Sequence, residues 1–166
     1  MDSASRHRLT SEQWCSLVEQ GIDIPLTIPI HGTSMLPLIR YARDPATIVP
    51  LKREPLVGDI VLFRRRDGEL VIHRVWQVLP DGVQTWGDNC RAKDRPVRRR
   101  DVLGLVVSVN RDGREIPLDT DRQRRSGVKW MTSPIRRPLW FGYRKARALA
   151  GRMIRRIWPG FHRDRS

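Results

Sequence analysis

Short runs rich in valine and isoleucine alternate with turn residues through most of the chain after Leu26. Seven of these runs predict strands, at residues 26–31, 46–51, 59–64, 69–79, 83–86, 102–110 and 114–118. Three of the connections contain Asp-Gly, a dipeptide that supplies the positive φ angles of tight hairpin turns. The pattern therefore predicts a mainly β body whose strands pair antiparallel.

Helical spacing of apolar residues occurs at the two ends of the chain. Thr10 can cap a short N-terminal helix, with Gln13 placed for a capping box and Gly21 placed to end it. From Leu139 to Trp158 apolar residues recur at helical spacing, and arginines and lysines fall on the opposite side. A short N-terminal helix and a basic amphipathic C-terminal helix are predicted.

These patterns divide the chain into four segments. An N-terminal helical segment at 1–25 precedes the β domain at 26–118. A polar stretch at 119–138 contains proline and has no apolar period, so it is predicted to be a linker. The basic amphipathic helical tail occupies 139–166.

The charge of the 166-residue chain, net +14, is concentrated in its tail. Residues 1–120 contain 18 Lys+Arg and 16 Asp+Glu, whereas residues 121–166 contain 14 and 2. The basic helix could pack on the β domain with its charges in solvent, bind an anionic membrane surface through residues 139–158, or bind an acidic partner including RNA. The hydrophobic pattern alone does not separate these three alternatives.

The sequence contains neither a membrane span, nor a signal peptide, nor a paired-cysteine motif, and these absences bear on the expected localisation and redox state. No window approaches the ~18 apolar residues of a membrane span, and residues 1–25 lack the apolar core of a signal peptide. A cytoplasmic protein is expected, with the basic tail able to hold it at the inner face of the membrane. Cys15 and Cys90 form no C-x-x-C, so both are interpreted as reduced structural thiols.

Three residue types with complementary chemistry follow one another along the β domain. Ser34 lies in a glycine-containing turn after a predicted strand, His73 lies within a strand, and Asp88 and Asp94 lie in the polar loop 87–101. Each alone is more often a turn residue, a packed histidine or a loop carboxylate. Together they could supply a nucleophile, its base and the group that orients the base.

In their order the motifs resemble the S24/S26 peptidase superfamily. The chain contains G-x-S-M-x-P at 32–37, G-D-I-V at 58–61, V-I-H-R-V at 71–75 and G-D-N at 87–89, with a further Asp six positions after the Asp of G-D-N. The set is similar to the signal peptidases of archaea, the endoplasmic reticulum and sporulating bacteria, which use Ser and His where leader peptidases use Ser and Lys. The resemblance implies a signal-peptidase/LexA-like antiparallel β domain.

The resemblance also implies a role for each matching residue. Ser34 would be the nucleophile, His73 the general base, Asp94 the carboxylate that orients the base, and Asp88 a support for its loop. The sequence itself leaves open whether Asp88 or Asp94 orients His73. The backbone N–H groups of Ser34 and Thr33 would form the oxyanion hole. No metal or cofactor is implied. An imidazole with an unperturbed pKa of about 6.5 would make the rate rise between about pH 6 and 7.

Two functions remain open from the sequence. The first is a serine endopeptidase that cleaves a peptide bond in a peptide or protein substrate, as in the maturation of a precursor peptide or preprotein. The second is a catalytically inactive β binding module attached through its basic tail to an acidic partner, a membrane or nucleic acid. Specific DNA binding is not expected, because about 30 residues before the motif are too few for a helix-turn-helix domain.

Overall fold

The computed structural model describes residues 10–157, with side chains described up to residue 150. The chain forms two compact units, Met1–Val128 and Lys129–Ser166. The first unit contains all the strands and the second contains the helix α3, at Arg136–Ile157.

Helix α1, at Ser11–Glu19, has the ends that the sequence predicts. The backbone N–H of Gln13 donates to Thr10 Oγ1 at 3.2 Å, and the backbone N–H of Thr10 donates to Gln13 Oε1 at 2.9 Å, which completes the capping box. Trp14 is fully buried and its indole N–H donates to the carbonyl of Ile24 at 2.7 Å. Helix α1 is thereby fixed to the start of the β domain.

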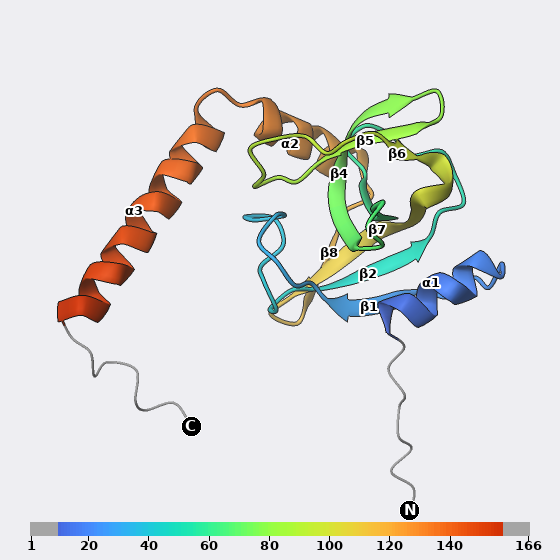
Figure 1. Cartoon of the computed structure of the whole chain (residues 1–166), viewed down its shortest axis with the longest axis horizontal. Coiled ribbons are helices and arrows are strands. Elements are labelled where there is room, and N and C mark those ends of the chain that lie inside the picture. Colours follow the sequence, from blue (N-terminus) through green and yellow to red (C-terminus); the bar gives the residue numbers. More distant parts are fainter. Residues whose placement is uncertain (1–9, 158–166) are drawn as a thin grey trace, which may run out of the picture. The chain divides into compact units, whose positions relative to one another are not determined.

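All strands belong to one antiparallel sheet that curls into a half-barrel (Figure 1). The strands are β1 (Leu26–Pro29), β2 (Pro45–Pro50), β3 (Ile60–Arg64), β4 (Leu70–Leu79), β5 (Gly82–Trp86), β6 (Val97–Arg98), β7 (Val102–Arg111) and β8 (Arg114–Pro117). Their order is β1-β2-β7-β3-β4-β5-β6, and β8 pairs with β7. The prediction of a mainly β, antiparallel fold with a helix near each end is confirmed, and the short strand β6 lies within the predicted polar loop.

Strand β3 is buried on both faces of the sheet, which explains its unbroken apolar sequence. Ile60 and Leu62 pack into one hydrophobic cluster with Trp14, and Val61 and Phe63 pack into a second. His73 on β4 lies directly opposite Val61, so its side chain points to the second cluster. The strand register therefore decides on which face of the sheet the imidazole lies.

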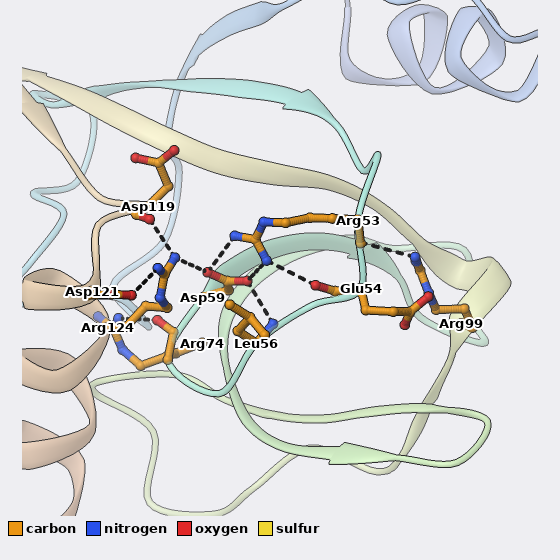
Figure 2. Close-up of polar contacts among 10 residues, drawn as sticks. Arg53, Glu54, Leu56, Asp59, Arg74, Arg99, Asp119, Asp121 and Arg124 are labelled. Carbon is orange, nitrogen blue, oxygen red and sulfur yellow. Dashed lines mark hydrogen bonds and ion pairs between the residues drawn. The ribbon is translucent and has the colours of Figure 1, made fainter.

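The predicted linker contains a helix, α2, at Asp121–Thr132. Arg124 binds the buried carboxylate of Asp59 with an Nη1–Oδ1 distance of 3.1 Å, and the same carboxylate is held by Arg53 (Figure 2). Gly127 lies against the guanidinium of Arg74, where an added Cβ would come within 2.2 Å of Cζ. The sequence did not predict this helix, because it is anchored by an ion pair and by the close approach of a small residue. Apolar residues do not recur along it at helical spacing.

The second unit matches the predicted amphipathic helix over the described residues. Helix α3 begins at Arg136, three residues before the predicted start, and continues to Ile157; Trp158 lies outside the described residues. Trp140 contacts the rings of Trp130 and Tyr143, at centroid distances of 6.3 and 6.0 Å. Within the part of the chain that the structure describes, each helix is too short or too polar to cross a membrane.

Candidate active site

His73 and Asp94 form a short hydrogen bond at the centre of the candidate site. His73 Nδ1 lies 2.6 Å from Asp94 Oδ2, and the imidazole is only 3% exposed. The ring of Phe63 packs beside the imidazole, with 6.1 Å between the ring centroids. The contact fixes the plane of the ring and leaves Nε2 as the nitrogen that can exchange a proton.

Asp94 is itself held in place by the neighbouring strand. Thr85 on β5 donates from Oγ1 to Asp94 Oδ2 at 2.8 Å, and the backbone N–H of Asp94 donates to the carbonyl of Thr85 at 2.9 Å. Arg65 approaches the other carboxylate oxygen, with an Nη2–Oδ1 distance of 3.5 Å. The carboxylate is oriented before any substrate binds. Thr85 and Arg65 have no place in the sequence motifs, and their contributions become visible only in the fold.

The pair changes the protonation of both partners. Burial alone lowers the pKa of His73, but the hydrogen bond to Asp94 and the contact with the Cys90 thiol outweigh burial and raise the pKa from 6.5 to about 9. Burial raises the pKa of Asp94, but the hydrogen bond and charge of His73 and the bond from Thr85 bring this pKa below its usual 3.8. At neutral pH the pair is therefore imidazolium and carboxylate, which moves the expected rise in rate from pH 6–7 toward pH 9.

Ser34 lies in the turn after β1, and the G-D-N loop holds this turn. The backbone N–H of Asn89 donates to the carbonyl of Ser34 at 2.7 Å, and Asn89 Nδ2 donates to the carbonyl of Thr33 at 2.7 Å. Both carbonyls are thus occupied. Among residues 10–157, the backbone N–H groups of Thr33 and Ser34 donate no hydrogen bond, so both remain available to an oxyanion.

Ser34 and His73 line the same cavity, of about 480 Å³. No hydrogen bond joins Ser34 Oγ to the imidazole within the described part of the chain. Catalytic hydrogen bonds are often long without substrate and shorten in the complex. The structure therefore brings the predicted nucleophile and base to one cavity and leaves the contact between them open.

Asp88 and Asp94 bind different partners in the structure. Arg74 donates from Nε to Asp88 Oδ1 at 2.8 Å and from Nη2 to Asp88 Oδ2 at 2.7 Å, and its Nη1 donates to the carbonyl of Gly58 at 2.8 Å. Both side chains are almost completely buried. The carboxylate of Asp88 thus anchors its loop to β4, while that of Asp94 contacts the imidazole.

Cys90 lies close to Nε2 of His73, the imidazole nitrogen that does not contact Asp94. Its Sγ is 3.9 Å from His73 Nε2, and its carbonyl accepts a hydrogen bond from the indole of Trp86 at 2.9 Å. A Cβ added at Gly87 would lie 2.6 Å from this sulfur, 2.9 Å from Nε2 and 3.0 Å from the carbonyl of Ser34. Gly87 is therefore the close-packed point where the serine turn, the imidazole and the thiol meet. The interpretation of Cys90 as a reduced structural thiol did not include this contact, and its position directly after G-D-N was the available signal.

Cys15, by contrast, is buried in the hydrophobic core, where burial raises the pKa of its thiol. Among the described residues, no group of three or more histidine, cysteine or acidic side chains is arranged to hold a metal ion. Searches of family models, of curated proteins and of solved structures find no match to this chain. What bears on the chemistry of the site is therefore its own geometry.

Proposed function

We propose that this protein is a serine endopeptidase of the Ser/His branch of the S24/S26 peptidases, with Ser34 as nucleophile. The observation that supports this most is the 2.6 Å contact between His73 Nδ1 and Asp94 Oδ2, with His73 lining the cavity that Ser34 also lines. A buried histidine that served only packing would not need an oriented carboxylate on one nitrogen and a cavity beside it.

The proposed mechanism is acyl transfer in two halves. His73 Nε2 takes the proton of Ser34 Oγ as Oγ attacks the carbonyl carbon of the substrate, and Asp94 stabilises the imidazolium through Nδ1. The backbone N–H groups of Ser34 and Thr33 stabilise the oxyanion. The proton then passes from Nε2 to the leaving amine, the C–N bond breaks, and water releases the acyl group by the same steps.

The direct test is labelling with a fluorophosphonate probe and hydrolysis of a peptide library. Ser34→Ala and His73→Asn are expected to lose both labelling and hydrolysis while the far-UV circular dichroism spectrum stays unchanged. Ser16→Ala, on the exposed face of α1, is the matched control and should react like the wild type. Full turnover by Ser34→Ala would exclude this mechanism and favour the catalytically inactive binding module.

Cys90 requires its own variant because its sulfur is 3.9 Å from Nε2 and a thiolate beside an imidazolium is a strong nucleophile. With Ser34 as nucleophile, Cys90→Ala should keep most of the hydrolysis and all of the fluorophosphonate labelling. Loss of hydrolysis in Cys90→Ala together with full turnover by Ser34→Ala would reassign the nucleophile to the thiol.

The basic helix α3 is proposed to attach the enzyme to an anionic membrane surface. Its described side chains include Arg144, Lys145 and Arg147, and the helix is amphipathic. Trp140 and Tyr143 contact each other within the same helix, and such aromatic side chains are common at membrane interfaces. A cytoplasmic enzyme held at the inner face of the membrane would meet substrates there.

A further inference from the structure

A second, larger cavity adjoins the candidate active site. It has a volume of about 840 Å³ and lies between the β3–β4 turn and the segment from Lys93 to Asp101. Arg65 lines both cavities, Asp94 lines the larger one, and its partner His73 lines the smaller one. The two cavities of the first unit thus share Arg65, and each is lined by one member of the hydrogen-bonded pair.

The wall of the larger cavity is strongly basic. Four arginines line it, are exposed, and have no ion pair with any described residue: Arg66, Arg95, Arg98 and Arg100. Lys93 also lines it, with its ammonium 4.5 Å from the ring centroid of Trp76. Of the three carboxylates in the wall, that of Asp94 is engaged by His73, which leaves Asp67 and Asp101. The cavity therefore has an excess of positive charge beside a nearly neutral remainder of the domain.

The floor of the cavity is apolar. Phe63 and Val97 are buried beneath the arginines, and Pro96 lies at the wall. An apolar floor with guanidinium groups around it fits peptide side chains that end in a carboxylate, because the methylene groups can pack below while the carboxylate accepts paired N–H donors. A volume of this size accommodates several side chains.

We infer that this cavity binds an acidic segment of the peptide substrate, on one side of the scissile bond. The inference rests on the proposed peptidase function and adds the substrate class. A peptide held against Ser34 in the smaller cavity would pass Arg65 into the basic one, where two or more Asp or Glu side chains meet the arginines. The positive field would also speed the encounter with an acidic substrate.

Nucleic acid is the other polyanion that arginines attract, and the wall fits it less well. Single strands are usually bound by stacking their bases on exposed aromatic side chains. Of the residues that line this cavity, Phe63 is the one aromatic, and it is only 1% exposed.

The binding experiment uses the full-length Ser34→Ala protein and two fluorescent twelve-residue peptides that differ only in Glu and Asp against Gln and Asn. Fluorescence anisotropy at about 0.1 M salt should give at least tenfold tighter binding of the acidic peptide. Adding Arg66→Glu and Arg98→Glu should remove most of that difference. Adding Arg114→Glu and Arg122→Glu instead, both exposed and outside the cavity wall, should change the affinity less than twofold. Because the basic tail is present in every variant, it contributes equally to each measurement.

Unchanged acidic-peptide affinity in the Arg66→Glu, Arg98→Glu protein, with its circular dichroism spectrum and melting temperature retained, would overturn the inference. So would a single-stranded oligouridine that binds more tightly than the acidic peptide and loses more affinity in the same variant. The hydrolysis arm compares kcat/KM of the active enzyme for the two peptides. Equal values for both would refute the acidic preference and leave the peptidase intact. Cavity-dependent binding without any hydrolysis or probe labelling would instead refute the peptidase and leave a binding site for acidic peptides.

Discussion

Arg74 and Asp88 form a buried, bidentate ion pair. Arg74 directly follows His73 in the sequence, and Asp88 directly precedes Asn89. His73 is the candidate base, and Asn89 holds the turn of Ser34 through hydrogen bonds to Thr33 and Ser34. The ion pair therefore joins β4 to the loop that holds the turn of Ser34, the candidate nucleophile. It touches neither reacting group.

Asp88→Asn should lower the free energy of unfolding by about 3–5 kcal/mol, because it leaves the guanidinium of Arg74 buried without its counter-charge. The measurement is urea unfolding followed by circular dichroism. Asp112→Asn, which removes a carboxylate that is 63% exposed and paired with Arg40, is the surface control and should cost less than about 1 kcal/mol. Equal effects of the two substitutions would contradict the structural role of Asp88.

Asp94→Asn should leave the fold intact and impair the chemistry. The plateau of kcat/KM is expected to fall by up to about 10⁴-fold, the size of effect that removal of an orienting carboxylate can have. The midpoint of the pH–rate profile should also move down from about 9, because the hydrogen bond and charge of Asp94 that raise the pKa of His73 against burial are removed. Asp81→Asn, in the exposed β4–β5 turn, should leave both quantities unchanged. A lower plateau with the midpoint still near pH 9 would show that Asp94 does not set the protonation of His73.

The same pair should make stability depend on pH within a defined window. Because the folded-state pKa of His73 is raised, its stabilisation is complete below about pH 6.5 and is lost as the pH rises through about 9. Because the folded-state pKa of Asp94 is lowered, its stabilisation is complete above about pH 4 and is lost as the pH falls through that lowered pKa. The shift of His73 from 6.5 to about 9 corresponds to roughly 3 kcal/mol. The stability advantage of the wild type over Asp94→Asn should therefore be largest between about pH 4.5 and 6.5 and shrink as the pH rises through about 9, and a difference that is constant up to about pH 10 would contradict the assignment.

Replacing Arg144, Lys145 and Arg147 with glutamate should abolish binding to vesicles that contain phosphatidylserine. Each basic residue near an anionic surface contributes about 1 kcal/mol, so three reversals should weaken binding by roughly a hundredfold or more. Vesicle co-sedimentation at low salt measures this, with Arg43, Arg114 and Arg122 replaced by glutamate as the charge-matched control in the first unit. If the intact protein does not bind such vesicles at low salt, the membrane proposal is wrong and the alternative is that α3 binds a protein or RNA partner.

A deletion variant for the same question has to end after Val128. Truncation after Leu118 cuts the chain at the start of the predicted linker. It would remove Arg124 and Gly127, which contact Asp59 and Arg74 of the first unit. Asp59 is fully buried and would lose one of its two arginines. Such a protein would be destabilised for a reason unrelated to membrane binding.

Most of the fold was predictable because strands, hairpin turns and caps leave local signals. The turn at Asp112-Gly113 has φ values of 52° and 85°, the positive angles that the dipeptide predicted. Helix α2 left no such signal, because it is anchored by contacts between residues about 50 to 65 positions apart. A pattern within a window of the sequence cannot record contacts of that range.

Part of the candidate site was likewise predictable from the sequence, and part of it was not. Chain order and the resemblance predicted that Ser34, His73 and Asp94 act together, and this remains a prediction. The sequence left open whether Asp88 or Asp94 contacts His73, and the fold distinguishes them, because Asp94 bonds to the imidazole and Asp88 to Arg74. The raised pKa of His73 was not predictable, since it depends on the burial of β4 and on the contacts with Asp94 and Cys90. The basic cavity was also missed, because its arginines come from the β3–β4 turn and from the segment after Asp94 and appear in the sequence as ordinary charged loops.

Strand β7 has a further consequence for when the candidate site can form during synthesis. In the sheet, β7 lies between β2 and β3, so β1, which leads to Ser34, and β4, which contains His73, are on opposite sides of it. During synthesis the earlier strands emerge first, and β7 ends only at Arg111. The turn of Ser34 and the strand of His73 therefore cannot be held in register through the sheet until Arg111 has been made. A growing chain that has not yet produced β7 keeps these two candidate groups on separate parts of the sheet, so the candidate site can form only once β7 has joined them.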